Sequence, residues 1–221
     1  MFNYFYKEKE NEDSKEIKLA MHHTAINYLL PKYIEEFRKI DKNTKFIVYD
    51  IKTSEALEKL ANGEIDIILT IIENVSSEFE LIPLSTFKPI ILVNKKNRLA
   101  IKKDNKITFE DLSRENMIMI DKKAISPFFI SVCNEYNITG DIEFVNGNWE
   151  TVRNFVKLNL GIHLYSEVYN KFEDFKDEEL LTKNLEHLFP KMTFQIITKK
   201  GVILKKNIKN FIEIVKNKMK N

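Results

Sequence analysis

The stretch IKLAMHHTAINYLLPKYIEEF, residues 17–37, joins a strand pattern to a helix pattern through a short polar turn. Residues 16–21 have the length and apolar content of a strand. From Ala25 onward, apolar residues recur every three or four positions, as they do on one face of a helix. These apolar positions are Ile26, Leu30, Tyr33, Phe37 and Ile40. The stretch therefore predicts a strand followed by a helix.

The same order repeats in the next part of the chain. A strand pattern over residues 44–51 precedes a helix pattern over 54–63, which Asn62 and Gly63 end, and an almost continuous apolar strand follows over 64–72. Strands that are apolar on both faces and alternate with helices belong to a parallel sheet that is covered on both sides. We therefore expect an α/β fold.

The alternation stops after this point, because two strand patterns at residues 79–85 and 88–94 follow each other without a helix between them. A second series of elements then begins. Its strand patterns cover residues 117–121, 141–145, 162–166 and 191–200, and its helix patterns cover 126–138, 148–160 and an apolar stripe from Ile208 to Met219. The chain thus predicts two α/β units with the paired strands between them.

The composition excludes several classes of protein. The 221 residues are 43% hydrophobic and carry a net charge of +2, too little for duplex binding by this segment alone. The single cysteine, Cys133, cannot form an intramolecular disulfide, and we expect it to pack as a small hydrophobic side chain on a helix. No apolar run reaches the roughly 18 residues of a membrane span, and no signal-peptide pattern opens the chain. We therefore expect a cytoplasmic protein with no membrane contact.

The order of the elements and several local strings resemble the effector-binding domain of LysR-type transcriptional regulators. Besides the opening stretch, these strings are LEKLANGEIDIILT, FELIPL, NRLA, ITFEDL and NWETVRNFVKLNLGIHL. The resemblance spans residues 16–219 in the family's order. It has two departures: Asn159 stands where a glycine is common, and Tyr165 and Ser166 stand where Leu-Pro is common.

The resemblance implies a periplasmic-binding-protein type II-like fold, in which two Rossmann-like lobes are joined by two crossing strands. Lobe I would comprise residues 16–90 with 198–221, and lobe II residues 91–197. Residues 1–15 change from aromatic to charged without a periodic pattern, and we expect them to be a tether or frayed end.

The function implied by the resemblance is that of a ligand-sensing and dimerisation domain, with neither a cofactor nor enzymatic activity. The family's winged helix-turn-helix would precede residue 1, so DNA would be contacted only through a domain absent from this chain. Similar domains form homodimers, which here would place residues 25–40 and 44–49 of one copy against 148–158 and 141–145 of the other.

Polar residues at strand and helix ends predict the ligand site. His22, His23 and Thr24 lie where the first strand gives way to a helix, and the unpaired N–H groups of a helix N-terminus favour an anion. Residues of similar character at other junctions are Thr53, Thr70, Ser126, Asn148 and Trp149. We expect all of these to line a cleft between the lobes that binds a small anionic effector.

Three alternatives remain open. In the first, each hydroxyl is only a helix N-cap, worth about 1 kcal/mol. In the second, histidines bind a metal, although the adjacent His22 and His23 cannot easily share one ion and His163 and His187 lack ligand spacing. In the third, the scaffold is a dehydratase or transferase, with Glu150 and His163 as acid and base. A solute-binding protein, a further class with this fold, would need an export signal, and the sequence shows none.

Overall fold

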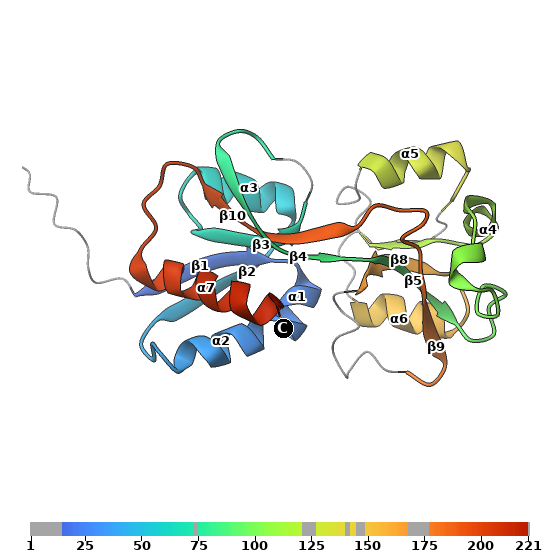
Figure 1. The fold of residues 1–221 in the computed structure, drawn as a ribbon, viewed down its shortest axis with the longest axis horizontal. Helices are drawn as coiled ribbons and strands as arrows, with labels where there is room; N and C mark the ends of the chain where they lie inside the picture. The colour runs from blue at the N-terminus through green and yellow to red at the C-terminus, as the bar shows by residue number, and fades with distance from the viewer. Residues whose placement is uncertain are drawn as a thin grey trace, which may run out of the picture.

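The computed structural model describes residues 15–72, 75–120, 127–139, 142–144, 149–167 and 177–220. Figure 1 shows them as two α/β lobes with long strands running between. The elements are β1 (Glu16–Met21), α1 (His23–Tyr28), α2 (Leu30–Arg38), β2 (Lys45–Asp50), α3 (Thr53–Ala61), β3 (Ile67–Ile71), β4 (Phe79–Phe87), β5 (Pro89–Asn94), α4 (Phe109–Ser113), β6 (Ile118–Ile120), α5 (Pro127–Glu135), β7 (Ile142–Phe144), α6 (Trp149–Lys157), β8 (His163–Ser166), β9 (Leu180–Asn184), β10 (Met192–Lys199) and α7 (Lys206–Lys220), with a short 3-10 helix at Asp104–Lys106.

The first lobe is built on a five-stranded sheet in the order β2-β1-β3-β10-β4. Strand β1 runs parallel to β2 and β3, and β10 runs antiparallel to β3 and β4. Neighbouring strand residues face opposite sides: Leu19 joins the core beneath α2 and α7, and Ala20 joins the core beneath α3. The strands are thus apolar on both faces, as the sequence predicts.

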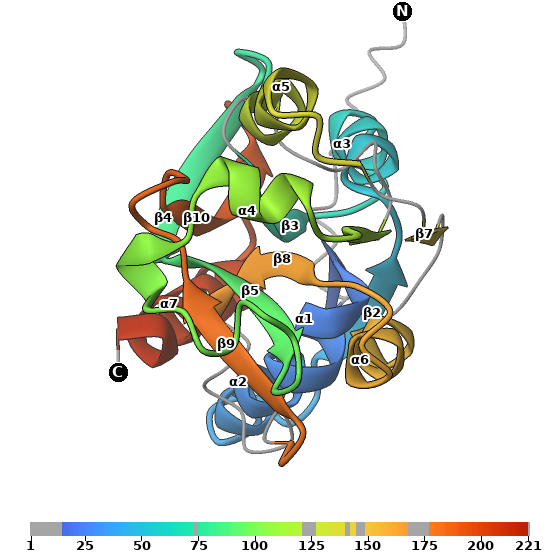
Figure 2. The same cartoon turned by 90° about the vertical axis from the view of Figure 1, so that its right-hand side faces the viewer.

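The second lobe contains two smaller sheets, an antiparallel one in the order β8-β5-β9 and a parallel pair of β6 and β7. A single bridge between Met117 and Ile162 links them. Figure 2, which faces this lobe, shows α4 and α5 on one side of the strands and α6 on the other. Ile91 and Ile90 accordingly belong to different core clusters.

The chain passes from the first sheet to the second at Lys88, the residue between β4 and β5. It returns through β10, which pairs with β3 and β4 along the first sheet. Residues 89–90 therefore pair in the second sheet and residues 192–197 in the first. We propose that the lobes divide at Lys88 and before Met192, rather than after residues 90 and 197.

The first predicted helix is two helices, α1 and α2, separated by Leu29. Pro31 at the start of α2 has no N–H to donate to the preceding turn, so the hydrogen-bond ladder cannot continue through it. The predicted apolar stripe also ends early. Helix α2 stops at Arg38, and Ile40 is 62% exposed instead of joining the core.

Several other sequence predictions fall within the described residues. Cys133 lies on α5 and packs against the second lobe's core. The stripe of α7 is buried as expected, from Ile208 to Met219. Within the ranges described, no helix is long and apolar enough to cross a membrane. Residues 1–14 lie outside those ranges, so the tether stays a prediction.

Candidate ligand-binding site

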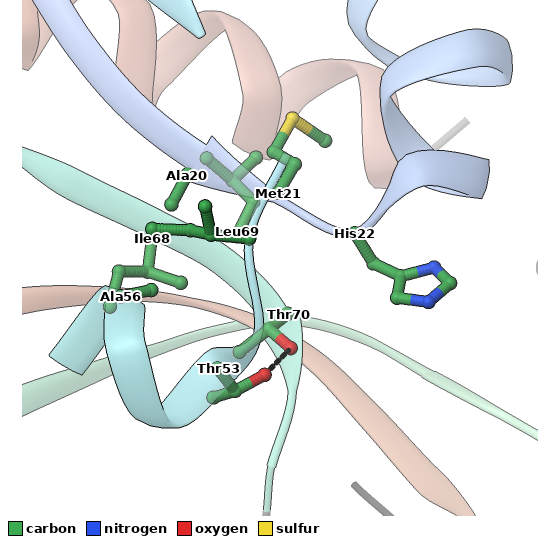
Figure 3. A pocket seen from close by; sticks show the side chains of 9 residues that line it. Ala20, Met21, His22, Thr53, Ala56, Ile68, Leu69 and Thr70 are labelled. Carbon is green, nitrogen blue, oxygen red and sulfur yellow. Dashed lines mark hydrogen bonds between the residues drawn. The ribbon is translucent and has the colours of Figure 1, made fainter. Parts of the chain in front are cut away.

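A small depression lies at the carboxyl ends of β1 and β3, beside the N-terminus of α3 (Figure 3). Its cavity volume is about 10 Å³, roughly the room that one water molecule needs. The lining residues are Ala20, Met21, His22, Ile51, Thr53, Ala56, Ile68, Leu69 and Thr70. Open α/β sheets bind ligands at this end of their strands, and metabolite pockets usually measure about 300 Å³ or more. The depression is therefore far too small to enclose a metabolite by itself.

Two predicted residues, Thr53 and Thr70, meet in this depression. Their hydroxyl oxygens lie 3.4 Å apart, and Figure 3 shows the two groups facing each other. Helix α3 begins at Thr53, and its N-cap residue Lys52 makes no side-chain capping bond. The N-cap alternative is therefore wrong for Thr53. The first N–H groups of α3 have no capping side chain and can receive an anion.

Gln195 adjoins the threonine pair and was not predicted. It lies opposite Thr70 in the antiparallel ladder of β3 and β10, so the two side chains share one face of the sheet. Its side chain is almost fully buried, and Nε2 donates to the carbonyl oxygen of Ile72. This contact joins residues far apart in the sequence, and no local pattern could have indicated it.

The turn between β1 and α1 supplies His22, whose side chain is exposed. Its carbonyl oxygen accepts the first hydrogen bond of α1 from Ile26 at 3.0 Å, and its ring extends away from the strand end in Figure 3. His23 and Thr24 begin α1, but their side chains are not among those described. Ser126 and Asn148 lie outside the described residues.

Trp149, the first residue of α6, belongs to an aromatic cluster in the second lobe. It is 3% exposed, and its ring centroid lies 4.7 Å from that of Tyr165 and 5.9 Å from that of His163. Burial raises the pKa of Tyr165. The cluster is apolar enough that Tyr165 and its neighbours stay uncharged near neutral pH.

His163 lies on β8 within this cluster and is 8% exposed. Its Nδ1 atom lies 2.8 Å from the carbonyl oxygen of Ile118. The pKa of His163 is lowered to about 4, mainly by burial; the hydrogen bond to Ile118 opposes this lowering, and the proximity of His22 adds a still smaller lowering. The imidazole is therefore neutral at physiological pH.

A hydrogen bond joins the lobes close to these residues. The Tyr28 hydroxyl on α1 donates to Oε1 of Glu150 on α6 at 3.0 Å, and the Tyr28 ring packs against core residues of both lobes. Because the second-lobe core that Tyr28 contacts contains Trp149 and Tyr165, α1 lies against the aromatic cluster.

The geometry gives little support to the metal and enzyme alternatives. In the portion of the chain that the structure describes, no group of three or more His, Cys, Asp and Glu side chains is placed to hold a metal ion. Glu150 accepts from Tyr28, and His163 contacts Ile118. Neither contact forms the acid–base pair that catalysis would require.

Comparison with known proteins identifies the family. The model of the LysR substrate binding domain matches residues 10–220. The chain belongs to this family. The HTH-type transcriptional regulator SsuR of Burkholderia cenocepacia is 21% identical over 206 residues, which cover 92% of this chain and 66% of the SsuR chain. Across the curated relatives, this LysR domain spans between 50% and 66% of their length, and all are named transcriptional regulators.

Solved structures of LysR domains share the fold. The cofactor-binding domain of the regulator Cbl has a TM-score of 0.78 at 22% identity, covering 94% of this chain and 90% of that one. The effector-binding domain of QuiR, solved in complex with shikimate, has a TM-score of 0.73 at 16% identity, covering 93% and 97%. The periplasmic-binding-protein type II-like fold implied by the sequence is thus confirmed.

Proposed function

We propose that this LysR domain is the ligand sensor of a transcriptional regulator and binds a small anionic metabolite between its lobes. The observation that carries the proposal is the uncapped N-terminus of α3, flanked by the hydroxyls of Thr53 and Thr70 at the carboxyl ends of the strands. DNA contacts would belong to another part of the regulator.

The chemistry of the depression favours negative charge. The residues that line it include no Asp or Glu, and they offer hydroxyls and an imidazole beside the helix N–H groups. Hydrogen bonds from backbone N–H groups to an anion are stronger than those to a neutral acceptor. The QuiR domain, whose structure contains shikimate, binds a carboxylate. We expect micromolar affinity, about −8 kcal/mol.

Calorimetry with small carboxylates and their neutral amides tests the anion site. We expect the acids to bind and the amides to bind at least tenfold more weakly. Thr53→Val and Thr70→Val should each weaken binding about tenfold, because each removes a hydroxyl donor of about 1.4 kcal/mol. Thr86→Val is the matched control, since Thr86 is an exposed threonine of the same sheet whose hydroxyl lies 3.5 Å from that of Thr193. Binding of only neutral or cationic compounds would contradict the proposal.

We also propose that the domain forms a homodimer through the predicted segments. Apolar side chains are exposed on or beside them: Ile40 after α2, Val48 on the edge strand β2, and Leu158 and Leu160 after α6. Exposed apolar groups on two separate elements fit an isologous contact. In such a contact, each of the two elements of one copy packs against the other element of the second copy.

Sedimentation velocity tests the dimer. Leu158→Glu places a charge at a side chain that is 71% exposed, and it should convert the dimer to a monomer at micromolar concentration. Ile203→Glu is the control, because Ile203 is 90% exposed in the loop before α7, away from the predicted interface. A wild-type domain that stays monomeric at high concentration would refute the dimer.

A further inference from the structure

We infer that His163 acts as a hydrogen-bond acceptor on the second lobe and makes the site select effectors that carry a hydroxyl or amine donor beside their anionic group. The inference rests on the proposed function and adds the chemical class of the effector. The anion would be held at α3 of the first lobe, and the donor would face His163.

The position of the imidazole proton follows from one contact. Nδ1 of His163 lies 2.8 Å from the carbonyl oxygen of Ile118, and a carbonyl oxygen can only accept. Nδ1 therefore carries the proton in this bond. In the neutral ring the other nitrogen, Nε2, has no proton and presents a lone pair.

The surroundings of the ring fix its charge and orientation. The Tyr165 ring stacks on it with an interplanar angle of 15°, and the Trp149 ring lies at a centroid distance of 5.9 Å. Burial among these rings holds the pKa of His163 well below neutrality, at about 4. A neutral imidazole with Nδ1 fixed cannot turn Nε2 into a donor without breaking the bond to Ile118.

Nε2 points away from Ile118 because the two nitrogens lie on different sides of the ring. The Ile118 carbonyl lies inside the second lobe, and Ile118 is fully buried there. Helix α1 of the first lobe reaches the surroundings of this ring, because Tyr28 packs against the core that contains Trp149 and Tyr165, whose rings flank His163. His163 thus lies on the side of the second lobe next to α1, and the turn that precedes α1 carries His22, which lines the depression.

Among the residues described, His163 makes its hydrogen bond through Nδ1 to Ile118, and Nε2 has no partner there. Nε2 is not one of the fully buried polar atoms that lack a partner, so it reaches accessible surface. A ligand that donates to Nε2 gains a hydrogen bond there, and a ligand without a donor does not. An oxyanion oxygen at the same place could not bond to Nε2, because both atoms present lone pairs and neither carries a proton. Hydroxy acids and amino acids fit this arrangement, whereas sulfate-like ions do not.

Matched pairs of probes test the selectivity by calorimetry. The pairs are shikimate with cyclohex-1-ene-1-carboxylate, lactate with propionate, and glycine with acetate, and sulfate serves as the donor-free oxyanion. In the wild-type domain we expect the donor-bearing probe of at least one pair to bind tenfold or more tightly than its analogue, because the analogue leaves Nε2 unpaired.

Variants of His163 assign this selectivity to the residue. His163→Phe keeps the aromatic packing and should reduce the ratio to about one, and His163→Gln, which has an amide oxygen as acceptor, should restore part of it. His187→Phe is the matched control, since His187 is a histidine of the same lobe whose Nε2 lies 2.8 Å from the Ile107 carbonyl oxygen. It should leave the ratio unchanged.

Nitrogen-15 NMR of the wild-type domain tests the ring state independently of any variant that folds poorly. At pH 7 it should show a neutral His163 protonated at Nδ1. An Nε2-protonated or charged ring overturns the inference, and so do equal affinities within every pair when the carboxylates bind. The latter result leaves the proposed function intact. If no carboxylate binds, the proposed function fails and the inference fails with it.

Discussion

The two lobes reach a folded core by different means. In the first lobe a continuous five-stranded sheet is covered on both faces, and aromatic contacts such as that of Phe37 with Phe211 fill the space under its helices. In the second lobe the strands form two short sheets, and buried polar side chains make further connections between its strands, helices and loops.

Asp111 and Asn94 illustrate these polar connections in the second lobe. Asp111 accepts hydrogen bonds from Arg98, Lys102 and the Thr108 backbone, and Asn94 donates to the carbonyl oxygen of Lys157. The first lobe is therefore held mainly by apolar burial, whereas the second also depends on charged groups. Acid should affect the second lobe more than the first.

The largest expected effect is in the first lobe. Phe37 is fully buried and makes edge contacts with the rings of Phe46 and Phe211 at 5.3 and 5.9 Å. Phe37→Ala should lower the free energy of unfolding by about 3–5 kcal/mol, measured by urea denaturation. Phe155→Ala in the second lobe should cost less, because that ring is half-buried. Equal losses of unfolding free energy in the two variants would show that the lobes do not differ in apolar packing.

Removing the charge of Asp111 should have the next largest effect. Burial alone would raise its pKa, but hydrogen bonds from Lys102, the Thr108 backbone and Arg98 outweigh it and lower the pKa to about 2. Asp111→Asn should lower the free energy of unfolding by about 2–3 kcal/mol, as expected for buried hydrogen bonds to a charged group. A loss under 0.5 kcal/mol in urea denaturation would show that these bonds contribute little.

Acid should destabilise the domain through His163. Its pKa is about 4 when folded and 6.5 when unfolded, so the unfolded chain binds the proton first. This contribution to stability is full above pH 6.5 and is lost as the pH falls towards 4. At pH 5 the loss is on the order of 2 kcal/mol. Urea midpoints at pH 7 and 5 measure it.

His163→Phe provides the control for this acid effect. The variant should lose the part of the pH dependence between pH 6.5 and 4, while the Asp111 contribution remains until lower pH, below its unfolded value of 3.8. If the wild type and the variant lose the same stability at pH 5, another group is responsible for the acid sensitivity of the lobe.

The smallest expected effect concerns a surface ion pair of the first lobe. Glu213 and Lys216 on α7 approach to 2.8 Å, and the glutamate side chain is 63% exposed. Lys216→Met should change the free energy of unfolding by less than about 0.5 kcal/mol, because solvent screens the pair. A larger loss in urea denaturation would show that charges matter as much in the first lobe as in the second.

Elements with a strong local pattern were predicted well from the sequence. The first strand agrees at both ends, and the paired strands without an intervening helix appear as β4 and β5. Strand β9 was missed because its residues, Leu180–Asn184, mix apolar and polar side chains over too short a length. The early end of α2 was missed because periodicity does not specify where a helix stops.

The candidate site was predictable only where it depends on strand and helix ends. Thr53 and Thr70 were each expected at such ends, and the structure brings them into contact. The state of His163 could not be predicted, because it depends on a carbonyl 45 residues away and on two rings from different elements. Gln195 likewise reaches the site only through the pairing of β10 with β3.

The position of β10 between β3 and β4 in the first sheet has a consequence during synthesis. Strands β3 and β4 leave the ribosome before the whole second lobe, but the strand that pairs with both of them is made after it. The second lobe can complete its own sheets while β3 still has an open edge, which is a hazard for aggregation. The first lobe is therefore begun first and completed last. A chain that ends before residue 192 would have a complete second lobe and a first sheet with an exposed edge.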